Sequence, residues 1–190
     1  MMRRAALPAL VLLIMAAPAQ AYVPPGDKII KSWITARERD AAPHTVKGTV
    51  RQGTVETPIQ VNVTKTSIEL TEGGRQVTDA VSLLVCTTLL RPSLAIPQLK
   101  QAGLDQDQAA LGRSNGRIAF TLGAPGENRP GTQVWIDRKW MVPLLLVLTL
   151  PGGGVVRVEY SDYDDRQGRF LPGEITVTRA GAVRKYLLPR

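Results

Sequence analysis

The stretch Gln133–Tyr163, QVWIDRKWMVPLLLVLTLPGGGVVRVEYSDY, decides the fold. It predicts three successive strands: the alternating segment Gln133–Asp137, the long apolar run Trp140–Leu150, and a second alternating segment, Val155–Tyr160. A short charged turn and a Pro-Gly-Gly-Gly turn separate them. Strands that follow one another across such turns are typical of an antiparallel sheet.

The middle strand of the three differs from an ordinary surface strand. From Val142 to Leu150 nearly every position is apolar, so both of its faces are expected to be covered. A flat sheet with one face in water does not need such a strand. A curved sheet closed over an apolar cavity or a helical plug does need one, and the pattern therefore predicts that the sheet encloses something.

The part of the chain before this stretch begins with an amphipathic helix. Asp27 is expected to cap it, and the helix runs to about Arg39. Arg37 falls among its apolar residues. We expect the aliphatic stem of Arg37 to lie along the core while its head reaches water. The alternative is that its guanidinium pairs with a buried acid or carbonyl and pins the helix to the sheet.

A helical insert follows in mid-chain. The segment Ala80–Leu90 is apolar almost all round and predicts a buried helix, stopped by Arg91-Pro92. A second short helix is predicted over Ile96–Ala102, with Pro97 near its start.

Strands are predicted on both sides of this insert, and the sequence therefore indicates an α+β fold. About four strands precede the insert and about seven follow it. The other expected strands cover 45–51, 57–64, 68–71, 108–113, 117–122, 170–179 and 182–187, with exposed loops at 123–131 and 164–168.

The N-terminus predicts export. A short basic region precedes an apolar stretch, and Ala19-Gln20-Ala21 supplies the pattern that a signal peptidase cuts. We therefore expect residues 1–21 to be a cleavable signal peptide and residues 22–190 to form a single domain in the periplasm, without a lipid anchor. The chain has one cysteine, Cys86, so an internal disulfide is excluded and the domain must be stabilised by burial alone.

The charge balance restricts the partners. A net charge of +8 permits contact with anionic lipid head groups or acidic partners. The sequence contains no dense basic cluster, so a solvated basic surface is the simpler interpretation. Basic runs interleaved with aromatic residues are missing as well, which disfavours nucleic-acid binding.

Two motifs suggest chemistry that their contexts do not support. Gly112–Gly116 has the G-x-S-x-G spacing of a hydrolase, with Ser114 as nucleophile, but a strand follows it and the only histidine, His44, precedes it. Asp162–Gly168 resembles a calcium loop, but its glycine comes too late and strands flank it. One histidine and one cysteine cannot supply a zinc site with soft ligands. We therefore expect no enzyme, no metal and no cofactor.

The order of elements and several short segments resemble a known family. The segments are GRIAFTLGA at 116–124, QVWID at 133–137, a proline-bearing strand at Pro143, VEYSDY at 158–163 and FLP at 170–172. They are similar to the LolA/LolB-like periplasmic lipoprotein-carrier superfamily and its outer-membrane lipoprotein-sorting relatives. The resemblance implies an open, curved antiparallel β half-barrel with helices on its concave side and an apolar cavity that binds acyl chains or hydrophobic segments.

The resemblance implies a non-catalytic carrier whose partners are lipid or lipoprotein acyl chains and membrane proteins of the envelope. Apolar residues at these periods are usually ordinary core. The candidates for cavity lining among them are Trp33, Leu84, Ile96, Leu99, Phe120, Trp135 and Leu146. The alternative is a structural or sensor interaction domain of the envelope that has the same fold, a filled core and no ligand.

Overall fold

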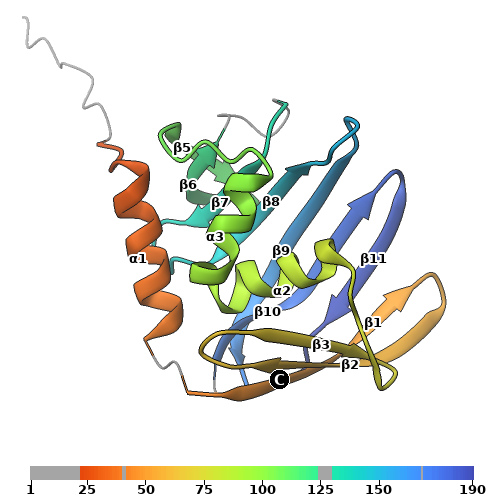
Figure 1. Ribbon diagram of the computed structural model, residues 1–190. Coiled ribbons are helices and arrows are strands. Elements are labelled where there is room, and N and C mark those ends of the chain that lie inside the picture. The colour runs from red at the N-terminus through yellow and green to blue at the C-terminus, as the bar shows by residue number, and fades with distance from the viewer. Residues whose placement is uncertain (1–21, 40–41, 124–129, 168) are drawn as a thin grey trace, which may run out of the picture.

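The computed structural model describes residues 22–39, 42–123, 130–167 and 169–190. Within these residues the chain forms three helices and one antiparallel sheet of eleven strands (Figure 1). No helix in this part of the chain is long and apolar enough to cross a membrane. The predicted signal peptide and most of the predicted loop at 123–131 lie outside the described residues.

The strands lie in the order β4-β3-β2-β1-β11-β10-β9-β8-β7-β6-β5. Their bounds are β1 His44–Gln52, β2 Val55–Val63, β3 Ile68–Glu72, β4 Arg75–Gln76, β5 Ala109–Ser114, β6 Arg117–Gly123, β7 Gln133–Asp137, β8 Pro143–Thr149, β9 Val155–Arg166, β10 Arg169–Arg179 and β11 Ala182–Leu187. Neighbours in the sheet are also neighbours in sequence, except that β1 pairs with β11, for example at Val50 and Tyr186. The predicted α+β class, with four strands, a helical insert and seven further strands, is confirmed.

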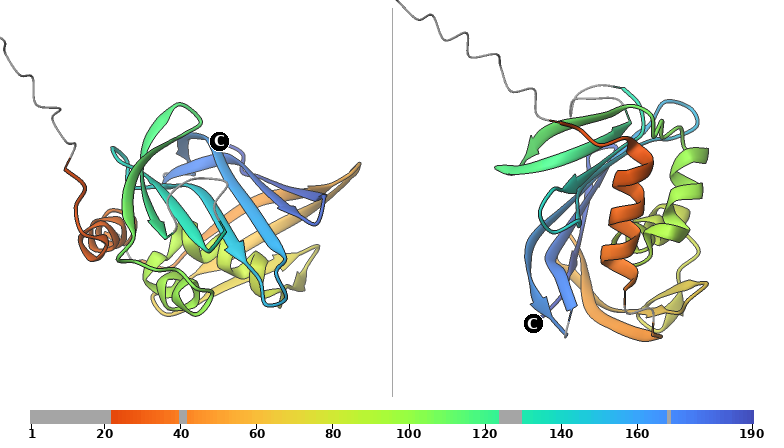
Figure 2. Two further views of the ribbon diagram at one scale, coloured as in Figure 1. Left: turned by 90° about the horizontal axis from the view of Figure 1, so that it is seen from above. Right: turned by 90° about the vertical axis from the view of Figure 1, so that its left-hand side faces the viewer.

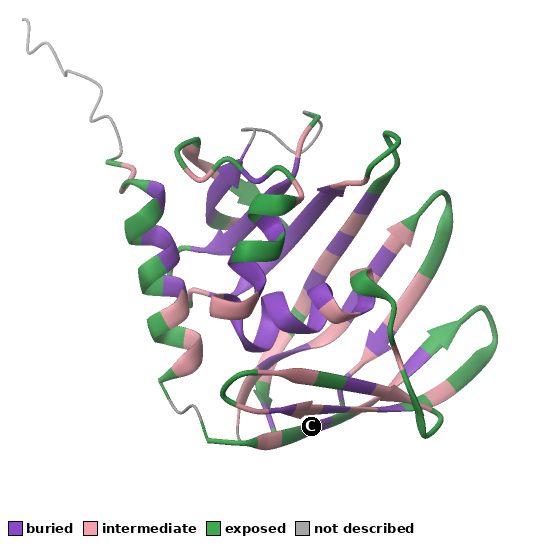
Figure 3. Cartoon of the chain, viewed as in Figure 1, coloured by how far each residue is buried: buried purple, intermediate pink, exposed green. Residues whose placement is uncertain are grey.

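The helices lie on the concave side of the curved sheet. They are α1 (Gly26–Glu38), α2 (Ala80–Leu90) and α3 (Pro92–Gln101), as Figures 1 and 2 show. From Leu84 to Leu90 every residue of α2 is buried (Figure 3). The hydroxyl of Tyr160, on β9, donates to the Val85 carbonyl at 3.2 Å and fixes α2 to the sheet. Because this part of α2 is enclosed, no face of the helix there is charged.

Strand β8 is buried on both faces, as its composition predicts. Every residue of β8 except Thr149 is buried. Leu146 belongs to the large apolar cluster beneath the helices, whereas Leu145 belongs to a second cluster with Trp135. Successive strand residues point to opposite faces, so these two clusters cover the concave and the outer side of β8.

The predicted strand Trp140–Leu150 is too long at its start. It begins at Pro143, because Asp137 accepts backbone hydrogen bonds from Lys139 and Trp140 at 2.8 and 2.7 Å. These two bonds close a turn. Trp140 therefore lies in the turn between β7 and β8 and is 48% exposed.

The polar loop predicted at 164–168 is wrong over most of its length. Strand β9 continues to Arg166, and β10 pairs with it from Arg169 onward. Arg166 is buried, and its guanidinium donates to the Leu188 carbonyl at 3.1 Å and to the Asp162 carboxylate at 2.8 Å. A polar segment thus forms a strand because its arginine finds acceptors inside the protein.

Two helix boundaries also differ from the prediction. Helix α1 begins before Asp27, which makes no capping hydrogen bond and lies in the first turn, where a negative charge is favourable. Pro92 does not simply end the insert. It occupies the first turn of α3, where its missing N–H costs nothing, so α3 starts earlier than the predicted Ile96 and contains Pro97 in its interior.

Arg37 pins α1 to the rest of the molecule. Its Nε donates to the Leu89 carbonyl at 3.2 Å and its Nη1 to the Phe170 carbonyl at 3.0 Å. Our expectation that the head of Arg37 reaches water is therefore wrong, and the alternative, pairing with carbonyls, is what the structure contains. Leu89 lies in the last turn of α2 and Phe170 is the second residue of β10, so one side chain joins the helix pair to the sheet.

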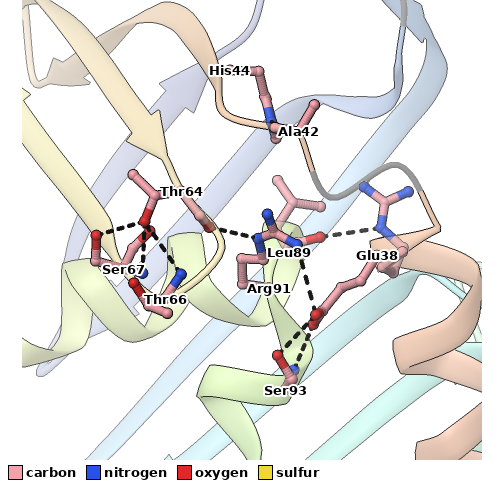
Figure 4. A network of polar contacts seen from close by, with 10 residues as sticks. Glu38, Ala42, His44, Thr64, Thr66, Ser67, Leu89, Arg91 and Ser93 are labelled. Carbon is pink, nitrogen blue, oxygen red and sulfur yellow. Dashed lines mark hydrogen bonds and ion pairs between the residues drawn. The ribbon is translucent and has the colours of Figure 1, made fainter.

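A second buried arginine, Arg91, joins α1 to the junction of α2 and α3 (Figure 4). Its Nε donates to the Thr64 carbonyl at 2.9 Å, and its Nη1 lies 3.7 Å from the Glu38 carboxylate. The same carboxylate accepts hydrogen bonds from the backbone N–H and the hydroxyl of Ser93, at 2.8 and 2.9 Å. Glu38 therefore caps α3 from a different helix.

Removal of the Glu38 carboxylate is expected to destabilise the fold. In Glu38→Ala, the α3 N-terminus loses its cap and Arg91 loses its carboxylate, which should lower the free energy of unfolding by about 2–3 kcal/mol. Chemical denaturation measures the loss. The matched control is Glu56→Ala, since Glu56 pairs with Arg51 where both side chains are about half exposed, and its loss should stay below about 1 kcal/mol. Equal losses in the two variants would contradict the role of Glu38.

The thiol of Cys86 is expected to be unreactive in the folded protein. Cys86 is buried in α2, and burial raises its pKa to about 12. The reactive thiolate is therefore scarce at neutral pH. A chromogenic disulfide reagent should label Cys86 slowly in buffer and rapidly in denaturant. Rapid labelling without denaturant would mean that α2 separates from the sheet in the native protein.

Candidate functional site

A groove of about 620 Å³ opens where the start of α2 and the end of α3 face the end of β8. We call it the α2–α3 groove. It is lined by Ala80, Val81, Leu84, Gln98, Gln101, Ala102, Gly103, Leu148, Thr149, Leu150 and Pro151. These residues are apolar or uncharged, and the buried Leu84 and Leu148 at its base belong to the main core cluster. The groove is thus an open extension of the apolar core.

The groove follows from how α2 and α3 are joined. Arg91 leaves the helical conformation, with φ −143° and ψ 70°, and Pro92 starts a new helix in a different direction. The two helices therefore meet at this point and run apart toward their other ends (Figure 1). Opposite them, Pro151 and Gly152 end the β8 strand in a turn with positive φ at Gly152. The space between these three ends forms the groove.

A second hollow, of about 400 Å³, separates α1 from β6 and from the turn before β8. We call it the α1 cleft, and it is lined by Tyr22, Pro24, Lys28, Ile29, Ser32, Phe120 and Met141. Gly26 holds the start of α1 in place, because a Cβ there would lie 1.8 Å from the Gln106 carbonyl oxygen. Only glycine permits so close an approach.

The structure brings six of the seven predicted lining residues to the concave side. Trp33, Leu84, Ile96, Leu99, Phe120 and Leu146 all belong to the main core cluster. Leu84 also lines the α2–α3 groove, and Phe120 lines the α1 cleft. Trp33, Leu99 and Leu146 are fully buried, each at 0% exposure. These three side chains pack against protein in this conformation.

Trp135 does not join the other six. It belongs to the second cluster, on the outer face of the sheet, and its Nε1 donates to the Gln133 side chain at 3.1 Å. Its ring lies against Gly112, where a Cβ would come within 2.4 Å of it. Because Val134 and Ile136 face the concave cluster, strand alternation sends the intervening Trp135 to the other side.

Sequence reasoning missed the polar and small residues of the groove. Gln98 and Gln101 form one turn of α3, and Ala102 and Gly103 follow them. The only sign of this groove in the sequence is a pair of glutamines beside the apolar residues at the end of a helix. This sign is weak. Leu150 was included in the predicted strand, but its position at the groove depends on the turn that follows it.

The residues considered for catalysis or metal binding are dispersed. Ser114 is buried at the end of β5, and the next two residues, Asn115 and Gly116, have φ of 49° and 76°, as an Asn-Gly hairpin turn requires. Asp162 pairs with Arg166. Within the described residues, no group of three or more His, Cys, Asp or Glu side chains could hold a metal ion.

Comparison with solved structures relates this fold to known ones. A LolA superfamily protein from Nitrosomonas europaea matches with a TM-score of 0.51 at 12% identity, over 90% of this chain and 93% of that chain. A domain assigned as an outer membrane lipoprotein-sorting protein, from Vibrio parahaemolyticus, matches with a TM-score of 0.52 at 11% identity, over 87% and 92%. A DUF1329 family protein from Desulfovibrio piger matches with a TM-score of 0.50 at 9% identity, over 87% and 92%. No protein-family model and no curated protein sequence matches this chain.

The chain therefore has a LolA-like fold. The likeness extends over nearly the whole of the described chain and of each matched structure, so it concerns the complete half-barrel and its helices. At identities of 9–12% it establishes the fold alone. The resemblance inferred from the sequence is thus confirmed for the architecture.

Proposed function

We propose that this protein is a non-catalytic periplasmic carrier that shelters a lipid, or the acyl chains of a lipoprotein, in an apolar site. The observation that carries the proposal is the α2–α3 groove, an uncharged and open hollow continuous with the core of a LolA-like half-barrel. Its volume of about 620 Å³ falls in the range of small-molecule binding pockets.

The composition of the groove suits an acyl chain. Val81, Leu84 and Leu150 offer apolar contacts, and each buried methylene contributes about 0.8 kcal/mol. Gln98 and Gln101 lie in the same lining and carry amide donors suited to an ester or amide carbonyl at the head of the chain. Binding of this kind requires no covalent chemistry and no charged anchor.

The deeper predicted residues would join the site through movement of the helices. Trp33 of α1, Ile96 and Leu99 of α3, and Leu146 of β8 are buried in the closed core. A longer ligand would reach them if the outer ends of α2 and α3 moved away from β8, which would break the hydrogen bonds of Ser82 to Tyr186 and of Ala102 to Thr132. Trp135 lies on the outer face and is no longer proposed as a ligand contact.

The location and partners belong to the same proposal. A cleaved signal peptide over residues 1–21 would place the mature chain in the periplasm, between a donor and an acceptor membrane. Its partners would then be acyl chains and membrane proteins of the envelope.

A charge placed in the groove is expected to weaken ligand uptake. Val81→Glu and Leu150→Glu alter partly buried groove residues, and each should weaken binding of a fluorescent fatty acid or lipopeptide at least about tenfold, because a buried unpaired carboxylate is costly. The control is Val183→Glu, at an exposed apolar residue of β11, which should bind as the wild type does. If delipidated wild-type protein takes up neither probe at micromolar concentration, the carrier proposal fails.

A specific observation also favours the second candidate, a structural or sensor interaction domain. Trp33, Leu99 and Leu146 are fully buried, so much of the concave side is filled by side chains. Native mass spectrometry of gently purified protein separates the two candidates. Co-purifying lipid is expected for the carrier, whereas a stable protein partner without lipid is expected for the interaction domain.

A further inference from the structure

The turn between β7 and β8 presents an exposed tryptophan beside a row of aromatic rings. Trp140 is 48% exposed, and its ring centroid lies 5.1 Å from that of Phe170. Phe170 in turn lies 5.5 Å from Tyr163. Ile118, on the neighbouring strand β6, is 44% exposed and lines the same hollow as Trp140. Two large exposed apolar side chains beside one hollow mark a candidate interaction site.

The turn that carries Trp140 is held in one conformation. The buried carboxylate of Asp137 accepts the backbone N–H groups of both Lys139 and Trp140. The Asp137 N–H also donates to the Val142 carbonyl at 2.8 Å. The turn is therefore well bonded and holds the indole half exposed, with Phe170 against one part of the ring.

Cations surround the aromatic row. Lys139 Nζ lies 4.6 Å from the centroid of the Trp140 ring, and the Arg117 guanidinium lies 5.9 Å from that of Tyr163. Arg138 is exposed in the same turn. Carboxylates lie nearby as well: Asp137 is 3.5 Å from Arg117, Asp165 pairs in register with Phe170, and Asp162 and Asp164 flank Tyr163 in the chain.

A second basic group adjoins the row at Phe170. A hollow of about 220 Å³ is lined by Phe170 together with Ala36, Arg37, Arg39, His44, Leu90 and Arg169. Arg37 is bound to two carbonyls, and no ion pair of Arg39 or Arg169 occurs within the described residues. We call this set of residues the Trp140 surface. It consists of the rings of Trp140, Phe170 and Tyr163, the side chain of Ile118, and the cations Arg37, Arg39, Arg117, Arg138, Lys139 and Arg169.

We propose that the Trp140 surface docks the protein on an anionic phospholipid bilayer. The partner must accept an indole and several cations side by side. The head-group region of a bilayer does so, because tryptophan is favoured at the membrane–water interface and lysine and arginine are attracted by anionic head groups. The α1 cleft begins beside this surface, since Met141 follows Trp140 and lines the cleft. Docking does not require that the α2–α3 groove hold a ligand.

The three tryptophans make a direct test possible. Trp33 and Trp135 are 0% and 4% exposed, so changes in fluorescence on docking report chiefly on Trp140. Vesicles of phosphatidylglycerol and phosphatidylethanolamine in equal parts should shift the emission to shorter wavelength and protect it from an aqueous quencher. Vesicles of phosphatidylcholine alone should have little effect, and added salt should weaken binding. An unchanged spectrum with the anionic vesicles would overturn the proposal.

Vesicle co-sedimentation of variants tests the location. Trp140→Ala and the double variant Arg138→Glu/Lys139→Glu should each reduce binding to the anionic vesicles at least about tenfold. The matched control is Arg75→Glu/Arg179→Glu, which changes the net charge equally at exposed residues at the ends of β4 and β10, and it should bind within about twofold of the wild type. Thermal denaturation verifies that all variants fold.

Two other results would also contradict membrane docking. Equal losses in both double variants would mean that binding depends on net charge alone. The other result is vesicle binding that is unaffected by Trp140→Ala while an acidic protein binds the wild type and not Trp140→Ala. That result would mean that the surface is a protein interface. Uptake of the fluorescent fatty acid is measured without vesicles, so failure of docking and failure of the carrier proposal are distinguishable.

Discussion

The burial of β8 on both faces is the constraint on which the rest of the structure depends. A strand with leucine or valine on both faces needs apolar side chains packed against each face. A single layer of helices covers only one of them. Here the concave side packs beneath the helices through Leu146, and the outer side packs with Trp135 and Ala119. The curvature of the sheet and the enclosed position of α2 both satisfy this requirement.

The helix pair is hydrogen-bonded at its junction and at its outer ends, and the groove opens between the outer ends. At the junction of α2 and α3, Arg91 and Glu38 form polar contacts to α1 and to β2–β3, and Arg37 binds the last turn of α2. At the opposite ends, the Tyr186 hydroxyl donates to the Ser82 hydroxyl at 3.1 Å and the Thr132 hydroxyl donates to the Ala102 carbonyl. The α2–α3 groove opens between these ends, and its lining is apolar or uncharged. Apolar contacts between its side chains can be exchanged for contacts to a ligand with little loss, which is what a carrier built on the fold would need.

The molecule thus presents two separate surfaces. The α2–α3 groove lies at the end of β8 and carries no charge among its lining residues, whereas the Trp140 surface lies before the start of β8 and combines aromatic rings with cations. The sequence has a net charge of +8 and no dense basic run. It therefore does not indicate that one surface is uncharged and the other is basic. Arg37 and Arg169 are far apart in the chain, and only folding brings them to one hollow.

The sequence by itself determined the elements whose signals are local. Three such elements depend only on neighbouring residues, and the structure contains all of them: the strands of Gln133–Tyr163, the apolar helix Ala80–Leu90 and the Asn115-Gly116 turn. What only the tertiary structure decided is which face each element presents. Trp135 lies on the outer face because long-range strand register sets the direction of every alternate side chain. Likewise, the carbonyls that hold Arg37 and the walls of the groove come from segments that meet only in the folded chain.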